Sequence, residues 1–287
     1  MPDLTVALVQ SNPVWEDVTA NLAHLSKELE NIDADLFVLP EMFNTGFTSN
    51  VEACAEKQFG QTFEWMKSFA EKKQCCITGS IIIEEDGHYY NRLYFANPFG
   101  IAQHYDKKHL WMGKEQEVFT PGNYRLEVLV KGWKICPLIC YDLRFPVWSR
   151  NFGHLDQKTP YDLLIYVASW PAARSHHWKS LLQARAIENL AYTVGVNRVG
   201  EDGNGVFHTG ASTAFDYKGE RLEMIENEVK TSVLTFSKSA LEQYRIDFPA
   251  WKDADSFSVK DRNLKPLSEH LVSHLFEEGE MRLKGEQ

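Results

Sequence analysis

The hydrophobic pattern of the first forty residues constrains the fold most strongly. An apolar run at residues 4–10 (LTVALVQ) precedes an amphipathic stretch at residues 15–32, and a second apolar run follows at residues 36–40 (LFVLP). Apolar residues recur along the middle stretch at spacings of four and three: Val18, Leu22, Leu25, Leu29 and Ile32. This spacing predicts one helix between two strands, the unit from which parallel sheets are built.

Hairpin signals follow this unit. A second amphipathic stretch at residues 61–73 predicts a helix, and an apolar run begins at residue 75. Asp86-Gly87 and the Asn-Pro-Phe-Gly sequence at residues 97–100 then separate runs rich in β-branched and aromatic residues. Residues 77–107 are therefore predicted to form three strands joined by tight turns.

The second half of the chain also mixes strands with helices. Strands are predicted for residues 133–140, 163–168, 193–199, 210–215 and 229–236, a helix for residues 176–192, and a turn for residues 216–219. Such a pattern predicts an α/β fold whose strands form two stacked mixed sheets covered by helices. We expect one domain over residues 1–257 and a C-terminal tail, residues 258–287, that packs on the surface or in a subunit interface.

Charge and cysteine content exclude several classes of protein. The chain has 40 acidic and 30 basic residues, a net charge of -10, and no Lys/Arg stripe, so nucleic acid is not an expected partner. The N-terminus lacks a secretory signal and no run is long enough to span a bilayer, which favours a cytoplasmic protein without a membrane partner. Five cysteines, without zinc-site spacing, predict free thiols and no metal or other cofactor.

Three segments each place one reactive side chain at the end of a predicted strand. Glu41 follows the strand in LFVLPEMFNTGF, Lys107 lies in YDKKHLW, and Cys140 begins CYDLRFP. A single cysteine in an apolar run is more often core than nucleophile. Together, however, a carboxylate, an ammonium group and a thiol at one sheet edge would supply a base, an electrostatic stabiliser and a nucleophile.

The order of these three segments resembles the carbon-nitrogen hydrolases of the nitrilase superfamily, from residue 4 to about residue 236. Further similar segments are Tyr90-Asn91, FTPG at residues 119–122, ARAIEN at residues 184–189 and GAS at residues 210–212. The CYDLRFP and SWPAAR segments are most similar to the ω-amidase branch, which hydrolyses the terminal amide of 2-oxo acids such as 2-oxoglutaramate and 2-oxosuccinamate. The resemblance implies an α-β-β-α sandwich and a homodimer or higher oligomer with buried helices at residues 145–152 and 176–192.

The lysine segment departs from the family pattern. The family usually shows Tyr-Arg-Lys before His-Leu, whereas this chain has two adjacent lysines, Lys107 and Lys108. Side chains alternate across a strand, so Lys107 and Lys108 point to opposite sides. Alignment of the family motif on His109-Leu110 gives the role of the family lysine to Lys107, and Lys108 is expected to face solvent. The resemblance also points to Glu115 as a second glutamate that orients the lysine or the substrate, although Glu117 lies close by.

The mechanism implied is an amide hydrolysis through a thioester. Cys140 attacks the amide carbon, Glu41 moves the protons, and the Lys107 ammonium with the backbone N–H of Tyr141 holds the developing oxyanion. Arg174 is our candidate for binding a substrate carboxylate. Aromatic candidates for the pocket wall are Phe43, Phe47, Trp111 and Trp170.

Other assignments remain open. Arg144 is expected to form an ion pair with Asp142 or Glu188, and no role is assigned to Asn197. Nitrile, N-carbamoyl or aliphatic amide hydrolysis would use the same three reactive residues. A binding module that kept the fold without catalysis is a further alternative.

Overall fold

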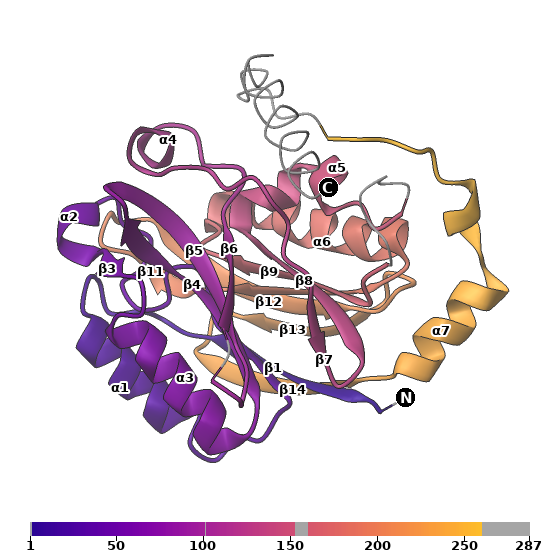
Figure 1. The fold of residues 1–287 in the computed structure, drawn as a ribbon, viewed down its shortest axis with the longest axis horizontal. Coiled ribbons are helices and arrows are strands. Elements are labelled where there is room, and N and C mark those ends of the chain that lie inside the picture. The colour runs from indigo at the N-terminus through magenta and orange to yellow at the C-terminus, as the bar shows by residue number, and fades with distance from the viewer. Residues whose placement is uncertain (1, 101, 153–159, 260–287) are drawn as a thin grey trace, which may run out of the picture. The chain divides into compact units, whose positions relative to one another are not determined.

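The computed structural model describes residues 2–100, 102–152 and 160–259, and Met1–Phe257 cluster as one compact unit (Figure 1). One sheet has the strand order β14-β1-β2-β4-β5-β6, with β3 beside β4. Its strands are β1 (Leu4–Gln10), β2 (Leu36–Val38), β3 (Glu56–Lys57), β4 (Cys76–Glu85), β5 (His88–Ala96), β6 (Ala102–Asp106) and β14 (Lys230–Phe236). The pairs β1–β2 and β2–β4 are parallel, whereas β4–β5–β6 is the predicted antiparallel meander.

The other sheet has the order β11-β12-β10-β9-β8-β7, with β13 beside β12. Its strands are β7 (Val128–Val130), β8 (Trp133–Ile139), β9 (Leu163–Ala168), β10 (Tyr192–Asn197), β11 (Val199–Glu201), β12 (Phe207–Phe215) and β13 (Arg221–Glu226). Strands β8, β9 and β10 run parallel, so this sheet is mixed as well.

Helices connect and cover the strands. They are α1 (Val18–Glu28), α2 (Val51–Cys54), α3 (Gln61–Lys73), α4 (Lys114–Val118), α5 (Pro146–Ser149), α6 (Ser175–Asn189) and α7 (Lys238–Asp247), with 3-10 turns η1 (Cys140–Arg144), η2 (Ala172–Arg174) and η3 (Ala250–Asp253). In the described part of the chain, no helix is both long and apolar enough for a membrane span.

Strand β1 shows why both faces of the first sheet are buried. Leu4, Val6 and Leu8 belong to the core that contains the strands of the second sheet. Ala7 and Val9 point the other way and pack with apolar residues of α1 and α3. Because side chains alternate along a strand, a run that is apolar throughout is stable only where both faces are covered.

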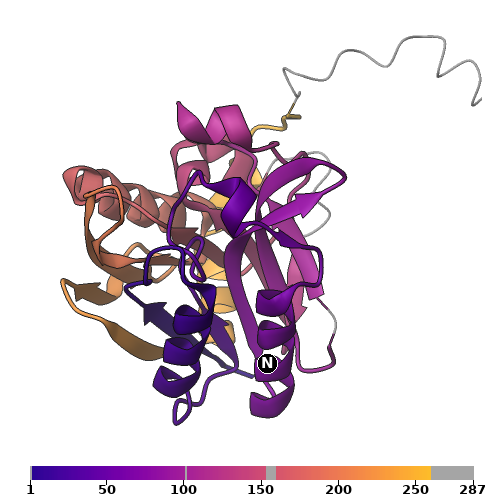
Figure 2. The same cartoon turned by 90° about the vertical axis from the view of Figure 1, so that its left-hand side faces the viewer.

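The helices form the outer layers. Figure 2 shows α1 and α3 side by side, and Figure 1 shows α6 on the opposite side of the molecule. Helix α6 packs so closely on β10 that a Cβ atom on Gly195 would lie 2.4 Å from Leu182 and 2.6 Å from Trp178. The predicted α-β-β-α sandwich with two stacked mixed sheets is thereby confirmed.

Several segments differ from the sequence-based expectations. The helix expected over residues 145–152 is reduced to the four residues of α5, and β13 and α7 were not predicted. Helix α7 is held by Asp162, whose carboxylate binds Lys238 and lies 3.1 Å from the Arg245 guanidinium. Apart from its first two residues, the tail expected over residues 258–287 lies outside the described residues.

Candidate active site

The carboxyl ends of strands from both sheets meet at one edge of the sandwich. Glu41 follows β2, Cys140 follows β8, and Ser169 follows β9. Parallel neighbours end at the same edge of a sheet, which is where α/β proteins place their sites. The two sheets are joined here directly, because the backbone N–H of Ser169 donates to Glu41 Oε2 at 2.8 Å.

The three predicted charged residues form one buried cluster. Lys107 Nζ donates to Glu41 Oε1 at 2.7 Å and to both Glu115 oxygens at 2.9 Å. None of the three side chains is more than 1% exposed. Asn91 Nδ2 bridges the two carboxylates, at 2.8 Å from Glu41 Oε1 and 3.0 Å from Glu115 Oε1. Four residues from separate segments are therefore locked in one hydrogen-bonded network.

The ammonium group of Lys107 lies between the carboxyl groups of Glu41 and Glu115. Burial by itself would lower the pKa of Lys107, but Glu115 and Glu41 outweigh it and raise that pKa. Burial raises the pKa of Glu115; Lys107 opposes this shift and Glu41 adds to it. Lys107 is thus held in its charged form, as an electrostatic stabiliser requires.

Cys140 begins the 3-10 turn η1 and has a φ of +41°. Positive φ is rare for residues other than glycine, and it costs energy that the surrounding structure must supply. Burial raises the pKa of Cys140 well above its usual range, Glu41 raises it further, partly through a hydrogen bond, and Lys107 lowers it. The resting sulfur is therefore a thiol that needs a base, and both Glu41 and Lys107 influence its pKa.

Aromatic side chains surround the residue next to Cys140. The ring of Tyr141 lies edge-on to Trp111, with ring centroids 4.9 Å apart, and the Arg174 guanidinium lies 4.7 Å from the centre of the Trp111 ring. Trp170 Nε1 donates to the Arg174 carbonyl at 2.8 Å. The ring centre of Phe47 lies 5.5 Å from Lys107 Nζ.

Three expectations require correction. Phe43 is 1% exposed and packs in the core beside α1 and α3, so it belongs to the core. Lys108 is half-buried over the ring of Trp148 instead of facing open solvent. The ion pair expected for Arg144 does not form with Asp142 or Glu188; its guanidinium lies over the Trp170 ring at 4.8 Å.

The expected partners of Arg144 are occupied by other groups. The Asp142 carboxylate accepts from Tyr105 Oη at 2.8 Å, from the backbone N–H of His109 at 3.0 Å and from that of Ile139 at 3.0 Å. Glu188 lies 3.0 Å from Arg185 and 3.9 Å from Arg150. These carboxylates hold the turn at Cys140 and helix α6 in place.

Two supporting residues were not recognised from the sequence. Asn91 carries the amide that joins Glu41 to Glu115, and only the Tyr90-Asn91 similarity hinted at it. The side chain of Asn197 accepts a hydrogen bond from the backbone N–H of Trp170 at 2.7 Å. It also donates to the backbone carbonyls of Trp170, at 3.0 Å, and Gly210, at 2.7 Å. A buried asparagine that satisfies three backbone groups fixes the loop that carries Trp170.

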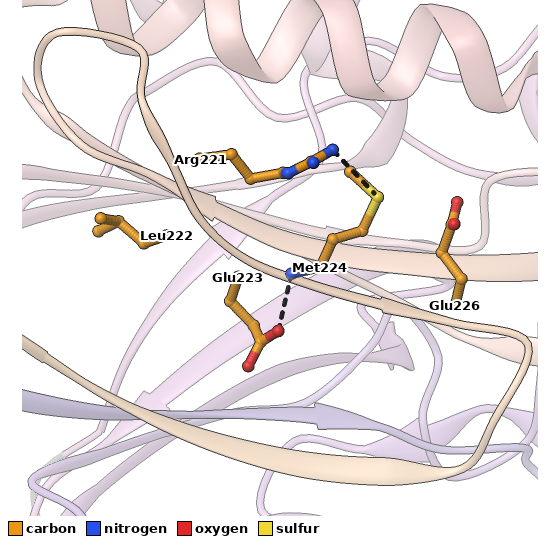
Figure 3. A pocket seen from close by; sticks show the side chains of 5 residues that line it. All are labelled: Arg221, Leu222, Glu223, Met224 and Glu226. Carbon is orange, nitrogen blue, oxygen red and sulfur yellow. Dashed lines mark hydrogen bonds between the residues drawn. The ribbon is translucent and has the colours of Figure 1, made fainter.

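A hollow elsewhere on the surface differs from this cluster in the side chains that line it. A surface hollow along β13 is lined by Arg221, Leu222, Glu223, Met224 and Glu226 (Figure 3). It contains neither a thiol nor a histidine, and its Arg221 points to the Met224 sulfur at 3.8 Å. Within the described ranges, no three His, Cys, Asp or Glu side chains are grouped as a metal site.

Several known proteins are similar to this chain in sequence. A model of the carbon-nitrogen hydrolase family matches residues 5–246. The omega-amidase YafV of Escherichia coli is 44% identical over 262 residues, which cover 90% of this chain and 100% of that protein. The 2-oxoglutaramate amidase of Bacillus subtilis is 34% identical over 184 residues, covering 63% of this chain and 70% of that protein.

A solved structure agrees closely with the described fold. A CN-hydrolase superfamily protein of Xanthomonas campestris, with an arsenic adduct in its active site, is 40% identical, covers 91% of this chain and 100% of its own, and superimposes with a TM-score of 0.88. Nit3 of Saccharomyces cerevisiae, a nitrilase superfamily member, shares the fold with a TM-score of 0.77 at 23% identity, covering 86% of this chain and 94% of its own. The chain therefore belongs to the carbon-nitrogen hydrolase family of the nitrilase superfamily and is a cysteine-dependent amidohydrolase.

Proposed function

We propose that this amidohydrolase cleaves the terminal amide of a small dicarboxylic half-amide, of the 2-oxoglutaramate or 2-oxosuccinamate type, to the acid and ammonia. Glu41, Lys107 and Cys140 are the proposed catalytic residues, with Glu115 orienting Lys107. Tyr141, Arg174, Trp170, Phe47 and Trp111 are the proposed substrate-binding residues. No cofactor takes part in the proposed reaction.

The observation that carries the proposal is the guanidinium of Arg174 beside the cysteine turn. It stacks on Trp111, which contacts Tyr141, the residue next to Cys140. No ion pair joins Arg174 to any described residue, although the chain carries excess acidic residues. A half-buried arginine without an acidic partner is suited to bind a carboxylate with two hydrogen bonds.

The first half-reaction begins with the thiol of Cys140. Its sulfur attacks the amide carbon while Glu41 accepts the thiol proton, and the carbonyl electrons move onto oxygen. The Lys107 ammonium and the Tyr141 N–H, which lies in the first turn of η1 where helical N–H groups lack an internal acceptor, hold that oxyanion. Glu41 then gives its proton to the departing nitrogen, so that ammonia leaves and a thioester remains.

The second half-reaction reverses these roles with water. Glu41 takes a proton from the water that attacks the thioester carbon, and the C–S bond breaks as the carbonyl re-forms. The proton returns to the sulfur, because the pKa of Cys140 is raised in this site. The thiolate released in this buried site therefore readily accepts the proton from Glu41, which regenerates the resting enzyme.

Similarity supports the same class of substrate. The relatives described above include an omega-amidase of Escherichia coli at 44% identity and a 2-oxoglutaramate amidase of Bacillus subtilis at 34% identity. These names describe those proteins, and we extend the activity to this chain on the basis of the cysteine site and the unpaired Arg174.

The test is ammonia release over a panel of 2-oxoglutaramate, 2-oxosuccinamate, glutamine, short aliphatic amides and N-carbamoyl compounds. We expect only the dicarboxylic half-amides to be hydrolysed efficiently. Arg174→Met, which keeps an unbranched side chain but removes the guanidinium, should lower their kcat/KM by about 100-fold, while Cys140 is still alkylated. Activity confined to neutral amides would overturn the substrate and leave the mechanism standing.

We further propose a cytoplasmic homodimer or higher homo-oligomer in which residues 1–257 form the catalytic domain and residues 258–287 a tail on the surface or in the interface. Val147 of α5 and Ile187 of α6 are 54% and 49% exposed, which supports an interface at these helices. Light scattering of the full chain tests the oligomer. A wild-type monomer at micromolar concentration would refute it.

A further inference from the structure

A second guanidinium, that of Arg144, lies at the same rim as Arg174. Its Cζ is 4.8 Å from the centre of the Trp170 ring and 6.0 Å from that of Tyr141. Building on the proposed function, we propose that Arg144 selects a 2-oxo group over a 2-amino group beside the substrate carboxylate, and that His177 positions it.

The two arginines share neighbours that place them on one small rim. Arg174 stacks on Trp111, and Trp111 contacts Tyr141, over which Arg144 also lies. Trp170 contacts both arginines: the Arg144 guanidinium lies over its ring, and its indole N–H donates to the Arg174 carbonyl at 2.8 Å. The two guanidinium groups are thus linked through the same three aromatic side chains, and the proposal assigns the carboxylate of the substrate to Arg174 and the group on its α-carbon to Arg144.

No carboxylate neutralises this pair among the described residues. Neither Arg144 nor Arg174 has an ion pair with a described residue. Asp142 and Glu188, which the sequence suggested as partners of Arg144, instead contact His109 and Arg185. A ketone oxygen can accept a hydrogen bond from Arg144. An α-ammonium group in the same place would meet a like charge, and this repulsion excludes amino acids such as glutamine.

His177 holds Arg144 without cancelling its charge. Arg144 Nη2 lies 3.2 Å from His177 Nδ1. A guanidinium has only donors, so this ring nitrogen is the acceptor in the hydrogen bond. An acidic residue here would attract Arg144 more strongly but would remove the positive potential that rejects an α-ammonium group.

The platform under Arg144 is rigid. Trp170 is 3% exposed, and Asn197 binds both its backbone N–H, at 2.7 Å, and its carbonyl, at 3.0 Å. A guanidinium fixed on one side by this indole and on another by His177 loses little further entropy when a substrate oxygen binds.

The experiment compares kcat/KM for 2-oxoglutaramate, for glutaramate, which has CH2 in place of the ketone, and for L-glutamine. Arg144→Met should lower the ratio of 2-oxoglutaramate to glutaramate by about 10- to 100-fold, the effect of losing one hydrogen bond to a charged group. Arg174→Met should lower both values together. The ratio of L-glutamine to glutaramate should rise in Arg144→Met, because the repelling charge is gone.

His177 is tested by rescue. His177→Leu removes the acceptor and should lower the same ratio in the same direction as Arg144→Met, whereas His177→Gln keeps an acceptor and should restore it. His176→Leu, on the exposed neighbouring histidine, is the matched control and should leave the ratio unchanged. Because these are ratios within one variant, partial unfolding does not imitate the result.

Two outcomes overturn the inference in distinguishable ways. If wild-type protein hydrolyses neither half-amide, the proposed function itself fails. If the wild-type protein hydrolyses both, but Arg144→Met lowers kcat/KM equally for 2-oxoglutaramate and glutaramate, Arg144 does not bind the ketone oxygen. Should Arg144→Met not fold, Arg144→Gln, which removes the positive charge but keeps a donor, should still raise the ratio of L-glutamine to glutaramate, and an unchanged ratio would overturn the inference.

Discussion

Replacing Glu115 by glutamine tests the buried charge cluster most directly. Its two carboxylate oxygens accept from Asn91, from Lys107 twice, and from the backbone N–H of Trp111 at 2.6 Å. All these partners are donors. In Glu115→Gln one oxygen becomes an NH2 group, and in either orientation that group faces two donors, one of which is always Lys107.

The magnitude follows from these contacts. Hydrogen bonds to charged groups contribute about 1.5–3 kcal/mol each, and two are lost, so the free energy of unfolding should fall by about 3 kcal/mol or more. Removing an oxyanion donor lowers kcat by about 100- to 1000-fold, and Glu115→Gln displaces Lys107 without removing it, so we expect about 10- to 100-fold. Glu115 has no free acceptor for substrate, so KM should stay within about threefold.

The assay combines steady-state ammonia release with urea unfolding. The matched control is Glu117→Gln, since Glu117 is an exposed carboxylate on the same short helix. Wild-type kcat in Glu115→Gln would refute the positioning role. A raised KM with unchanged kcat would instead mean that Glu115 contacts the substrate.

Three further predictions rest on single contacts. Glu41→Gln should shift the pH profile of Cys140 alkylation to lower pH, because the Glu41 carboxylate raises the pKa of that thiol; a shift to higher pH would contradict this. Gly122→Ala should destabilise the fold by about 1–3 kcal/mol in urea, since its Cβ would lie 2.1 Å from the Asp106 carbonyl oxygen. Asp162→Asn should cost about 3–5 kcal/mol in the same measurement, because it leaves buried cations of α7 without their carboxylate, and wild-type stability would disprove that role.

Local pattern was enough to predict most of the fold. Strand β1 and helix α3 were predicted with the bounds that the structure has, because a run that is apolar throughout and a stripe at helical spacing are both set by neighbouring residues. Helix α7 was missed because its contacts are with distant segments: Asp162, which binds its Lys238, lies 76 residues away along the chain. Such long-range ion pairs leave no periodic signal in the sequence.

The sequence by itself determined which reactive residues follow strands, namely Glu41 after β2 and Cys140 after β8. Only the tertiary structure decided how they act on one another. The contact between Glu41 and Ser169 spans 128 residues, and the expected ion pair of Arg144 is replaced by stacking on Trp170. Strand ends follow from local hydrophobic periodicity, whereas the charge, burial and hydrogen-bond partners of a side chain depend on which distant segments fold against it.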